Sequence, residues 1–268
     1  MDTSALATRM KENYEKPYRH YLTRRTPVAI RLDGKAFHTF TRGFNRPFDK
    51  CFGDAMVKTM EYLCENIQGC VFGYTQSDEI TLILLDYQTF DTQPWFDYRV
   101  DKLCSITASM ATLAFNRAFS DTVDEWGSVT FDSWYEGGTY EEVDPDMLKL
   151  SEAYGTALKR GGMFDARAFN IPKEEVCNLI FWRQLDATRN SIQMVGQAHF
   201  SHEELDEKTC SDIQDMLMEK YNINWNNYPT RWKRGVAWRP YWKVDYNMPI
   251  LKGDDRSYVD SEIYVGEK

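Results

Sequence analysis

The chain has 268 residues, of which 43% are hydrophobic and 27% charged, so it is long and apolar enough to fold around a sizeable core. Its 41 acidic and 32 basic residues give a net charge of −9, which argues against a protein that coats nucleic acid through a generally basic surface, although a local basic face remains possible. No apolar run reaches the roughly 18 residues of a membrane-spanning helix, and the charged N-terminus lacks an apolar signal core. We therefore expect a soluble, cytoplasmic protein.

The six cysteines contain no C-x-x-C pair, and a chain of this length does not depend on disulfides, so we expect free thiols and no zinc site. The one close histidine pair, His199 and His202, coincides with a capping-box pattern formed by Ser201 and Glu204. A helix start at Ser201 is therefore the simpler interpretation of this segment.

The first half of the chain alternates between strand and helix patterns. Alternation of apolar and polar residues predicts strands, and apolar residues at helical spacing predict helices. In chain order we expect a polar, helix-compatible segment at 4–23, a strand at 28–34, an irregular segment to 49, a helix at 52–67, strands at 69–75 and 80–87, and a helix from about 100 to 113.

This β-α-β-β-α order predicts an α/β (α+β) fold with a split β-α-β antiparallel sheet and helices packed on one face. We assign residues 1–138 to this palm-like region and 139–268 to a largely helical C-terminal region packed on it. In the second half we expect a possible strand at 128–135, an exposed loop at 136–146, a strand at 164–172, helices at 173–194 and 201–220, and a strand between Trp232 and Trp238.

Two acidic motifs stand at strand ends. Asp33 ends one predicted strand in "RLDG", and Asp78 with Glu79 lies between two others in "GYTQSDEI". Each motif alone is typical of an ordinary turn. If the strands are neighbours, however, Asp33 and Asp78 meet at one edge of the sheet, where carboxylate oxygens suit Mg²⁺ with substrate phosphates. Gly34 would let a phosphate approach the backbone closely.

The stretches "RLDGKAFHTF", "GYTQSDEI", "FDARAF" and "WRQLDATRN" resemble the tRNA-His guanylyltransferase family, over most of the chain from about residue 9 to 239. That resemblance implies a palm related to those of polymerases and cyclases, two Mg²⁺ ions, and nucleotide addition to the 5′ end of tRNA in the 3′-to-5′ direction. It implies that Asp33, the Gly34 carbonyl and Asp78 hold the metals. It also implies catalytic roles for Asp33, Asp78 and the adjacent acid Glu79.

The resemblance further implies a nucleotide-binding set and an RNA-binding set. Arg46 stands where the family usually has a lysine, and an arginine fork contacts phosphate oxygens differently from an ammonium group. The nucleotide-binding set is Asp33, Gly34, Lys35, Ala36, Phe37, His38, Arg46, Ser77, Asp78, Arg99 and Lys102. The RNA-binding set is Arg24, Arg25, Arg183, Asn190, Lys233 and Arg234, and for Arg183 a packing and ion-pairing role is an equal alternative.

One departure from the family is informative. After "WRQ-x-D" the eukaryotic members carry H-I-N-N-L-Y-N, whereas this chain has "TRNSIQM", with Thr188 in place of the histidine and only Asn190 in register. This favours the relatives that repair 5′-truncated tRNAs by template-dependent addition, using ATP or GTP and other NTPs. Dedicated guanylate addition to tRNA-His, a nucleotidyl cyclase and a non-catalytic RNA-binding module remain alternatives. By resemblance we also expect a homotetramer and no membrane association.

Overall fold

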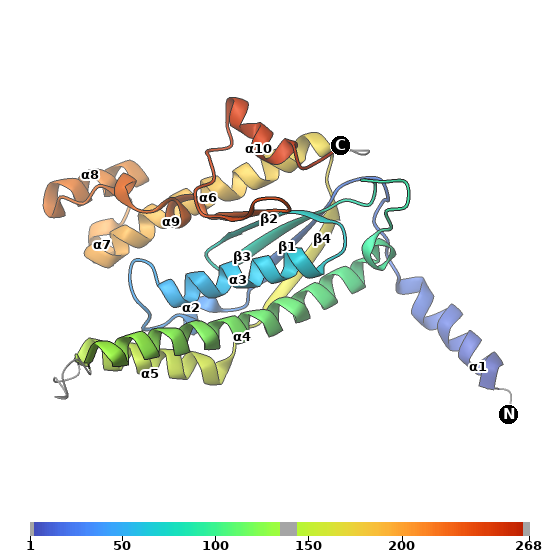
Figure 1. The fold of residues 1–268 in the computed structure, drawn as a ribbon, viewed down its shortest axis with the longest axis horizontal. Helices are drawn as coiled ribbons and strands as arrows, with labels where there is room; N and C mark the ends of the chain where they lie inside the picture. Colours follow the sequence, from blue (N-terminus) through green and yellow to red (C-terminus); the bar gives the residue numbers. More distant parts are fainter. Residues whose placement is uncertain (1–2, 135–143, 265–268) are drawn as a thin grey trace.

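A six-stranded antiparallel sheet forms the centre of the molecule in the computed structural model, which describes residues 3–134 and 144–264 (Figure 1). The strand order is β4-β1-β3-β2-β5-β6, so β1 lies between β3 and the edge strand β4. The strands are β1 (Val28–Gly34), β2 (Cys70–Gln76), β3 (Glu79–Leu84), β4 (Phe164–Asn170), β5 (Val236–Arg239) and β6 (Lys243–Asp245).

Two long helices, α3 (Lys50–Asn66) and α4 (Val100–Trp134), pack on one face of the sheet. Val28, Ile30 and Leu32 of β1 point to this face because side chains alternate along a strand, and they are almost completely buried against the two helices. The Asp49 carboxylate caps α3 by accepting a hydrogen bond from Phe52 N. The predicted β-α-β-β-α palm, with its helices on one face, is thus confirmed.

Helices from the C-terminal part of the chain cover the opposite face. Helix α6 (Lys173–His199) buries Val176, Cys177 and Ile180 against Ala29 and Ile83 of the sheet, and α10 (Ser257–Asp260) joins the same apolar cluster. Figure 1 shows α6 and α10 above the sheet, with α3 and α4 below it. The sheet is therefore a middle layer, because the C-terminal helices add a second cover to the palm.

Several predicted elements differ in the structure. The segment 128–134 is the end of α4, not a strand. Helix α5 (Pro145–Arg160) begins within the last two residues of the loop expected at 136–146, and residues 136–143 of that loop lie outside the described residues. The helix expected at 201–220 is broken into α7 (His202–Leu205) and α8 (Cys210–Tyr221). Each begins with a capping box, formed by Ser201 and Glu204 in α7 and by Thr209 and Asp212 in α8. The second capping box therefore starts a new helix.

The remaining elements are short. Those of the N-terminal segment form an arm that projects from the body (Figure 1). No helix among the described residues is long and apolar enough to cross a membrane. These elements are α1 (Thr3–Met10), η1 (Lys11–Glu15), η2 (Lys16–Tyr18), α2 (Phe37–Phe40), η3 (Trp95–Tyr98), η4 (Trp225–Asn227), α9 (Thr230–Arg234) and η5 (Gly253–Arg256).

Candidate active site

Asp33 and Asp78 lie at the same edge of the sheet. Strands β1 and β3 are hydrogen-bonded neighbours in which Asp33 pairs with Glu79, and the Gly34 N–H donates to the Asp78 carbonyl at 3.0 Å. The end of β1 is thereby fastened to the β2–β3 turn. The two strands are thus neighbours, as the meeting of Asp33 and Asp78 requires, and both residues lie at one corner of the molecule.

The β2–β3 turn holds Asp78 in an unusual environment. Ser77 has a left-handed backbone, with φ of 49°, which is costly for a residue other than glycine and is often found at functional sites. The Ser77 hydroxyl donates to Asp78 Oδ1 at 3.1 Å. The pKa of Asp78 is raised to about 6, chiefly by burial and also by the nearby negative charge of Asp33, while hydrogen bonds to the carboxylate oppose this rise. A cation bound beside this carboxylate would favour its ionised form.

A cleft of about 590 Å³ opens beside the two acids. Its walls come from the end of β1, the segment between α2 and α3, the β2–β3 turn and the last turns of α6. Among the residues predicted for nucleotide binding, it is lined by Asp33, Gly34, Ala36, Phe37, His38, Arg46, Ser77 and Asp78. Lys35 is exposed but does not line the cleft, and its N–H donates to the Met163 carbonyl.

The wall of this cleft is held by aromatic packing. Phe37 is buried, with its ring 5.1 to 5.8 Å from the rings of Phe40, Phe52, Phe115 and Phe164. A Cβ at Gly34 would lie 2.5 Å from the Phe37 ring, which explains in packing terms why glycine stands there. The packing of its ring thus fixes the position of Phe37 in the wall of the cleft.

Glu79 faces away from the cleft, toward α6. Its carboxylate accepts from Arg183 at 2.8 and 2.9 Å and from Arg31 at 3.3 Å. Arg183 is only 4% exposed and also pairs with Asp186 at 2.6 Å. Of the two roles considered for Arg183, the structure therefore places it in buried packing and ion pairing, without a surface for direct RNA contact. Glu79 is likewise occupied by arginines.

Arg99 and Lys102 are not brought into the cleft. They lie at the start of α4, where the Leu22 N–H donates to the Tyr98 carbonyl. Arg24 and Arg25 precede β1 at the same end of the sheet. Because Asp33 lies at the other end of the seven-residue strand β1, these four cations are separated from it by roughly 20 Å of strand. Arg99 also pairs with Asp101 at 2.7 Å.

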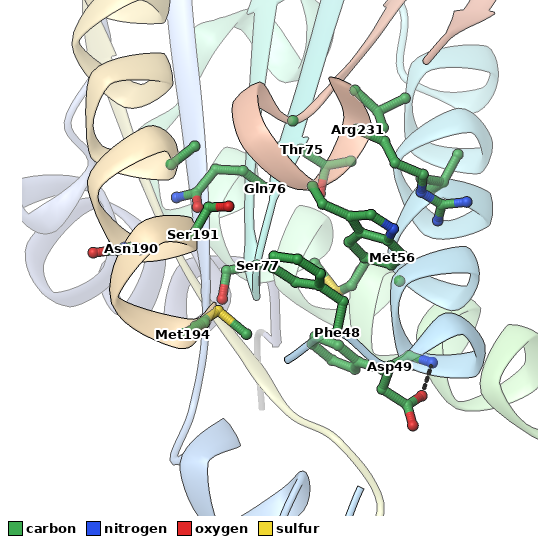
Figure 2. A pocket seen from close by; sticks show the side chains of 17 residues that line it. Phe48, Asp49, Met56, Thr75, Gln76, Ser77, Asn190, Ser191, Met194 and Arg231 are labelled. Carbon is green, nitrogen blue, oxygen red and sulfur yellow. Dashed lines mark hydrogen bonds between the residues drawn. The ribbon is translucent and has the colours of Figure 1, made fainter. Parts of the chain in front are cut away.

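The other RNA candidates lie near a second cavity, of about 90 Å³ and mostly apolar, next to the cleft. Figure 2 shows Phe48, Ser77, Asn190 and Met194 around it. Asn190 of α6 is among the residues that line it. Lys233 and Arg234 belong to the adjacent α9, where Lys233 Nζ lies 5.6 Å from the Trp225 ring centroid. The two cavities adjoin, since Asp49, Phe52, Ser77 and Met194 line both.

Sequence reasoning missed two residues at the site. Asp49 is buried between the cavities and accepts hydrogen bonds from Asn45 N at 3.1 Å and Tyr154 Oη at 2.7 Å. An Asp directly before a helical apolar pattern is an N-cap pattern, which could have located it. Arg167, in the quoted "FDARAF", lies 4.0 Å from Asp33 Oδ2.

The donor set fits a divalent cation. Asp33, Asp78 and the Gly34 carbonyl offer only oxygen ligands, the type that Mg²⁺ prefers. Among the described residues no group of three or more His, Cys, Asp or Glu side chains could hold a metal, so any ion here would depend on these two carboxylates, a backbone oxygen and ligands from substrate.

Comparisons with known proteins agree with this site. A family model described as "tRNAHis guanylyltransferase" matches residues 7–172. A "Bacterial tRNA(HIS) Guanylyltransferase (Thg1)-Like Protein in complex with ATP" is 37% identical, with a TM-score of 0.78 over 97% of this chain and 100% of that one. The corresponding structure in complex with GTP is 33% identical, with a TM-score of 0.73 over the same shares.

An uncharacterised protein of Acanthamoeba polyphaga mimivirus is 31% identical over 241 residues, which are 86% of this chain and 75% of that one. The family model alone covers more than half of the chain. The neighbours have the palm-like fold expected from the sequence. The chain therefore belongs to the tRNA-His guanylyltransferase family and is a nucleotidyltransferase.

Proposed function

We propose that this protein adds nucleotides to the 5′ end of truncated tRNA, in the 3′-to-5′ direction and under the direction of a template. The observation that carries the proposal is the meeting of Asp33 and Asp78 at the mouth of a cleft lined by Arg46 and His38. Support also comes from the two bacterial relatives, whose structures are complexes with ATP and with GTP.

The reaction has two transfers. An oxygen of the RNA 5′-monophosphate attacks the α-phosphorus of ATP, and pyrophosphate leaves. The 3′-hydroxyl of an incoming NTP then attacks the activated 5′ phosphorus, loses its proton, and AMP leaves. A nucleoside triphosphate would occupy the cleft, where Arg46 would pair with its phosphates and His38 would orient them; that both residues line the cleft supports these roles.

Asp33, the Gly34 carbonyl and Asp78 would hold two Mg²⁺ ions, which supply charge neutralisation at the transferred phosphoryl group and acidify the attacking hydroxyl. The chain itself aligns the two carboxylates through the β1–β3 register and the Gly34–Asp78 hydrogen bond. By resemblance to the family we also expect a homotetramer that works in the cytoplasm.

Dedicated guanylate addition to tRNA-His is the second candidate, since the family model carries that name. Thr188, at the position of the family's histidine, donates its hydroxyl to the Lys233 carbonyl at 3.0 Å and so joins α6 to α9. A residue engaged in that way favours the repair reaction, because the side chain that marks the dedicated enzymes is replaced by a structural contact.

The test uses tRNA transcripts that lack the first nucleotide and carry a 5′-monophosphate, with ATP, labelled NTPs and Mg²⁺. We expect extension that follows the opposing template base in several tRNA species. Asp78→Asn should lower the rate by about a thousandfold or more, while Asp121→Asn, on α4 away from the cleft, should not. Absence of extension with every template would contradict the proposal, and guanylate addition to tRNA-His alone would support the second candidate.

A further inference from the structure

The α6 side of the sheet remains open next to Asp33. Asp33 pairs across β1 and β4 with Asp165, and Arg31 pairs with Arg167. These four side chains share a face because residues two apart on a strand point the same way. That face is the one on which α6 packs, yet Arg167 is 54% exposed and Asp33 48% exposed. A strip of sheet surface beside edge strand β4 is thus accessible right up to Asp33.

A large aromatic side chain borders this strip. Trp182 of α6 is 52% exposed, although a tryptophan usually buries most of its surface. The guanidinium of Arg31 lies 5.2 Å from its ring centroid and that of Arg183 lies 4.5 Å away. Since Arg183 is buried and ion-paired with Glu79, the indole packs against a guanidinium group that is itself held in place. An exposed, immobilised aromatic ring flanked by arginines is a stacking platform for nucleobases.

A second exposed cation follows on the same face of α6. Arg189 is seven residues, or about two turns, after Trp182, and its side chain is 61% exposed. The acids in this area are already paired. Asp165 accepts from Arg167 at 3.3 Å, and Asp186 pairs with both Arg183 and Arg189.

This surface is separate from the nucleotide cleft, whose lining contains none of Arg167, Trp182 and Arg189. Asp33 borders both. A reaction that joins two substrates at Asp33 needs a second approach once a triphosphate fills the cleft, and the α6 side provides one.

We propose that Arg167, Trp182 and Arg189 bind the 5′-terminal stretch of the RNA acceptor. Arg167 pairs with the 5′-phosphate beside Asp33, Trp182 stacks on an unpaired terminal base, and Arg189 pairs with a backbone phosphate further along. Stacking on a ring tolerates every base, which fits a template that chooses the nucleotide by pairing. This inference rests on the proposed function, because it assigns a place to that reaction's RNA substrate.

The test compares Trp182→Ala and Arg167→Gln with two matched controls. Trp242→Ala removes another exposed tryptophan, with 70% of its surface accessible, from the β5–β6 turn at the opposite edge of the sheet. Arg117→Gln removes an exposed arginine from α4. We expect the KM for truncated tRNA to rise about tenfold or more in each test variant, as loss of one stacked base or one charged hydrogen bond predicts. The KM for ATP should stay within about twofold of the wild-type value, whereas partial unfolding would affect both substrates. Trp182→Phe should restore most of the RNA affinity.

A cross-linking experiment gives a readout that does not need turnover. The wild-type protein is irradiated with a 5′-monophosphorylated RNA that carries 4-thiouridine as its first nucleotide. Cross-links in the peptide containing Trp182 or Arg167 would support the proposal. Cross-links confined to α3 or α9, or test variants that match their controls in KM for RNA, would overturn it. Cross-linking at Trp182 without any extension would instead mean that the proposed reaction is wrong and the binding surface right.

Discussion

Arg183 Nη2 lies 2.8 Å from Glu79 Oε2, and this contact joins helix α6 to the strand that follows the Asp78 turn. Both side chains are largely buried, with 5% and 21% of their surfaces exposed. Because Arg31 also contacts the carboxylate, the second acid of the "SDE" motif is neutralised from the α6 side. Asp33 and Asp78, in contrast to Glu79, line the cleft.

Removal of this arginine should destabilise the protein strongly. Arg183→Ala leaves Glu79 and Asp186 as partly buried acids without their main partner, and the free energy of unfolding should fall by about 3–5 kcal/mol. Glu79→Gln added to Arg183→Ala should recover part of the loss. Arg189→Ala, which removes an exposed partner of the same Asp186, should cost less than about 1 kcal/mol. Urea unfolding of the wild type and these three variants measures the differences, and equal losses for the two arginines would contradict the assignment.

The raised pKa of Asp78 predicts a pH-dependent cost in the metal-free protein. A carboxyl whose pKa rises to about 6 on folding disfavours the folded state when ionised. The cost is absent below the unfolded pKa, grows between about pH 4 and 6, and is complete above that range. Asp78→Asn should then stabilise the protein in EDTA by about 1–3 kcal/mol at pH 8 and by roughly half as much at pH 5. Thermal unfolding across this pH range measures it, and a stabilisation that grows on acidification would reverse the sign.

Arg46 offers a test of the triphosphate site. Its side chain is exposed and lines the cleft, so Arg46→Ala should raise the KM for NTP by about 10–100-fold through loss of a charge-assisted contact. Arg46→Lys should keep the charge and lose less. Lys50→Ala, which removes an exposed cation paired with Asp54 outside the cleft, is the control in steady-state kinetics. Equal effects of the alanine variants at 46 and 50 would remove Arg46 from the site.

Gly73 of β2 gives a packing test. A Cβ there would lie 2.3 Å from Cys64 Sγ and 3.3 Å from Met60 Cγ, so Gly73→Ala should cost about 1–3 kcal/mol through overpacking. Adding Cys64→Ala should recover part of that cost, because the sulfur is the nearest atom. Gly155→Ala in α5, where a Cβ meets nothing within 4 Å, should instead stabilise by about 0.5–1 kcal/mol. Denaturant midpoints distinguish the two glycines.

The parts of the fold that sequence predicted are those in which one local pattern dominates. Val28, Ile30 and Leu32 alternate and form β1, and the capping box at Ser201 lies where a helix begins. The segment 128–134 was misjudged because its β-branched and aromatic residues favour a strand locally, whereas it continues the 35-residue helix α4. The break between α7 and α8 follows from a second cap at Thr209, which the apolar spacing alone did not reveal.

The meeting of Asp33 and Asp78 was predictable because Asp33 lies near the end of β1 and Asp78 directly precedes β3, and these two strands pair directly. The phosphate roles of Arg99 and Lys102 depend on three-dimensional placement that a resemblance does not supply, and in the described chain they lie at the far end of β1 from Asp33. The partners of Glu79 were equally hidden, since Arg183 is 104 residues away in sequence.

The phenylalanine stack behind the cleft has a consequence for binding. The segment after β1 has little regular structure, but Phe37, Phe40 and Phe44 fix it to Phe115 and Phe119 of α4. The conformational entropy of this wall is therefore lost during folding and not at the moment a nucleotide arrives. A preorganised wall lets more of the interaction energy appear as affinity. Amide hydrogen exchange of the Phe37 to Phe44 backbone should accordingly change little when ATP binds.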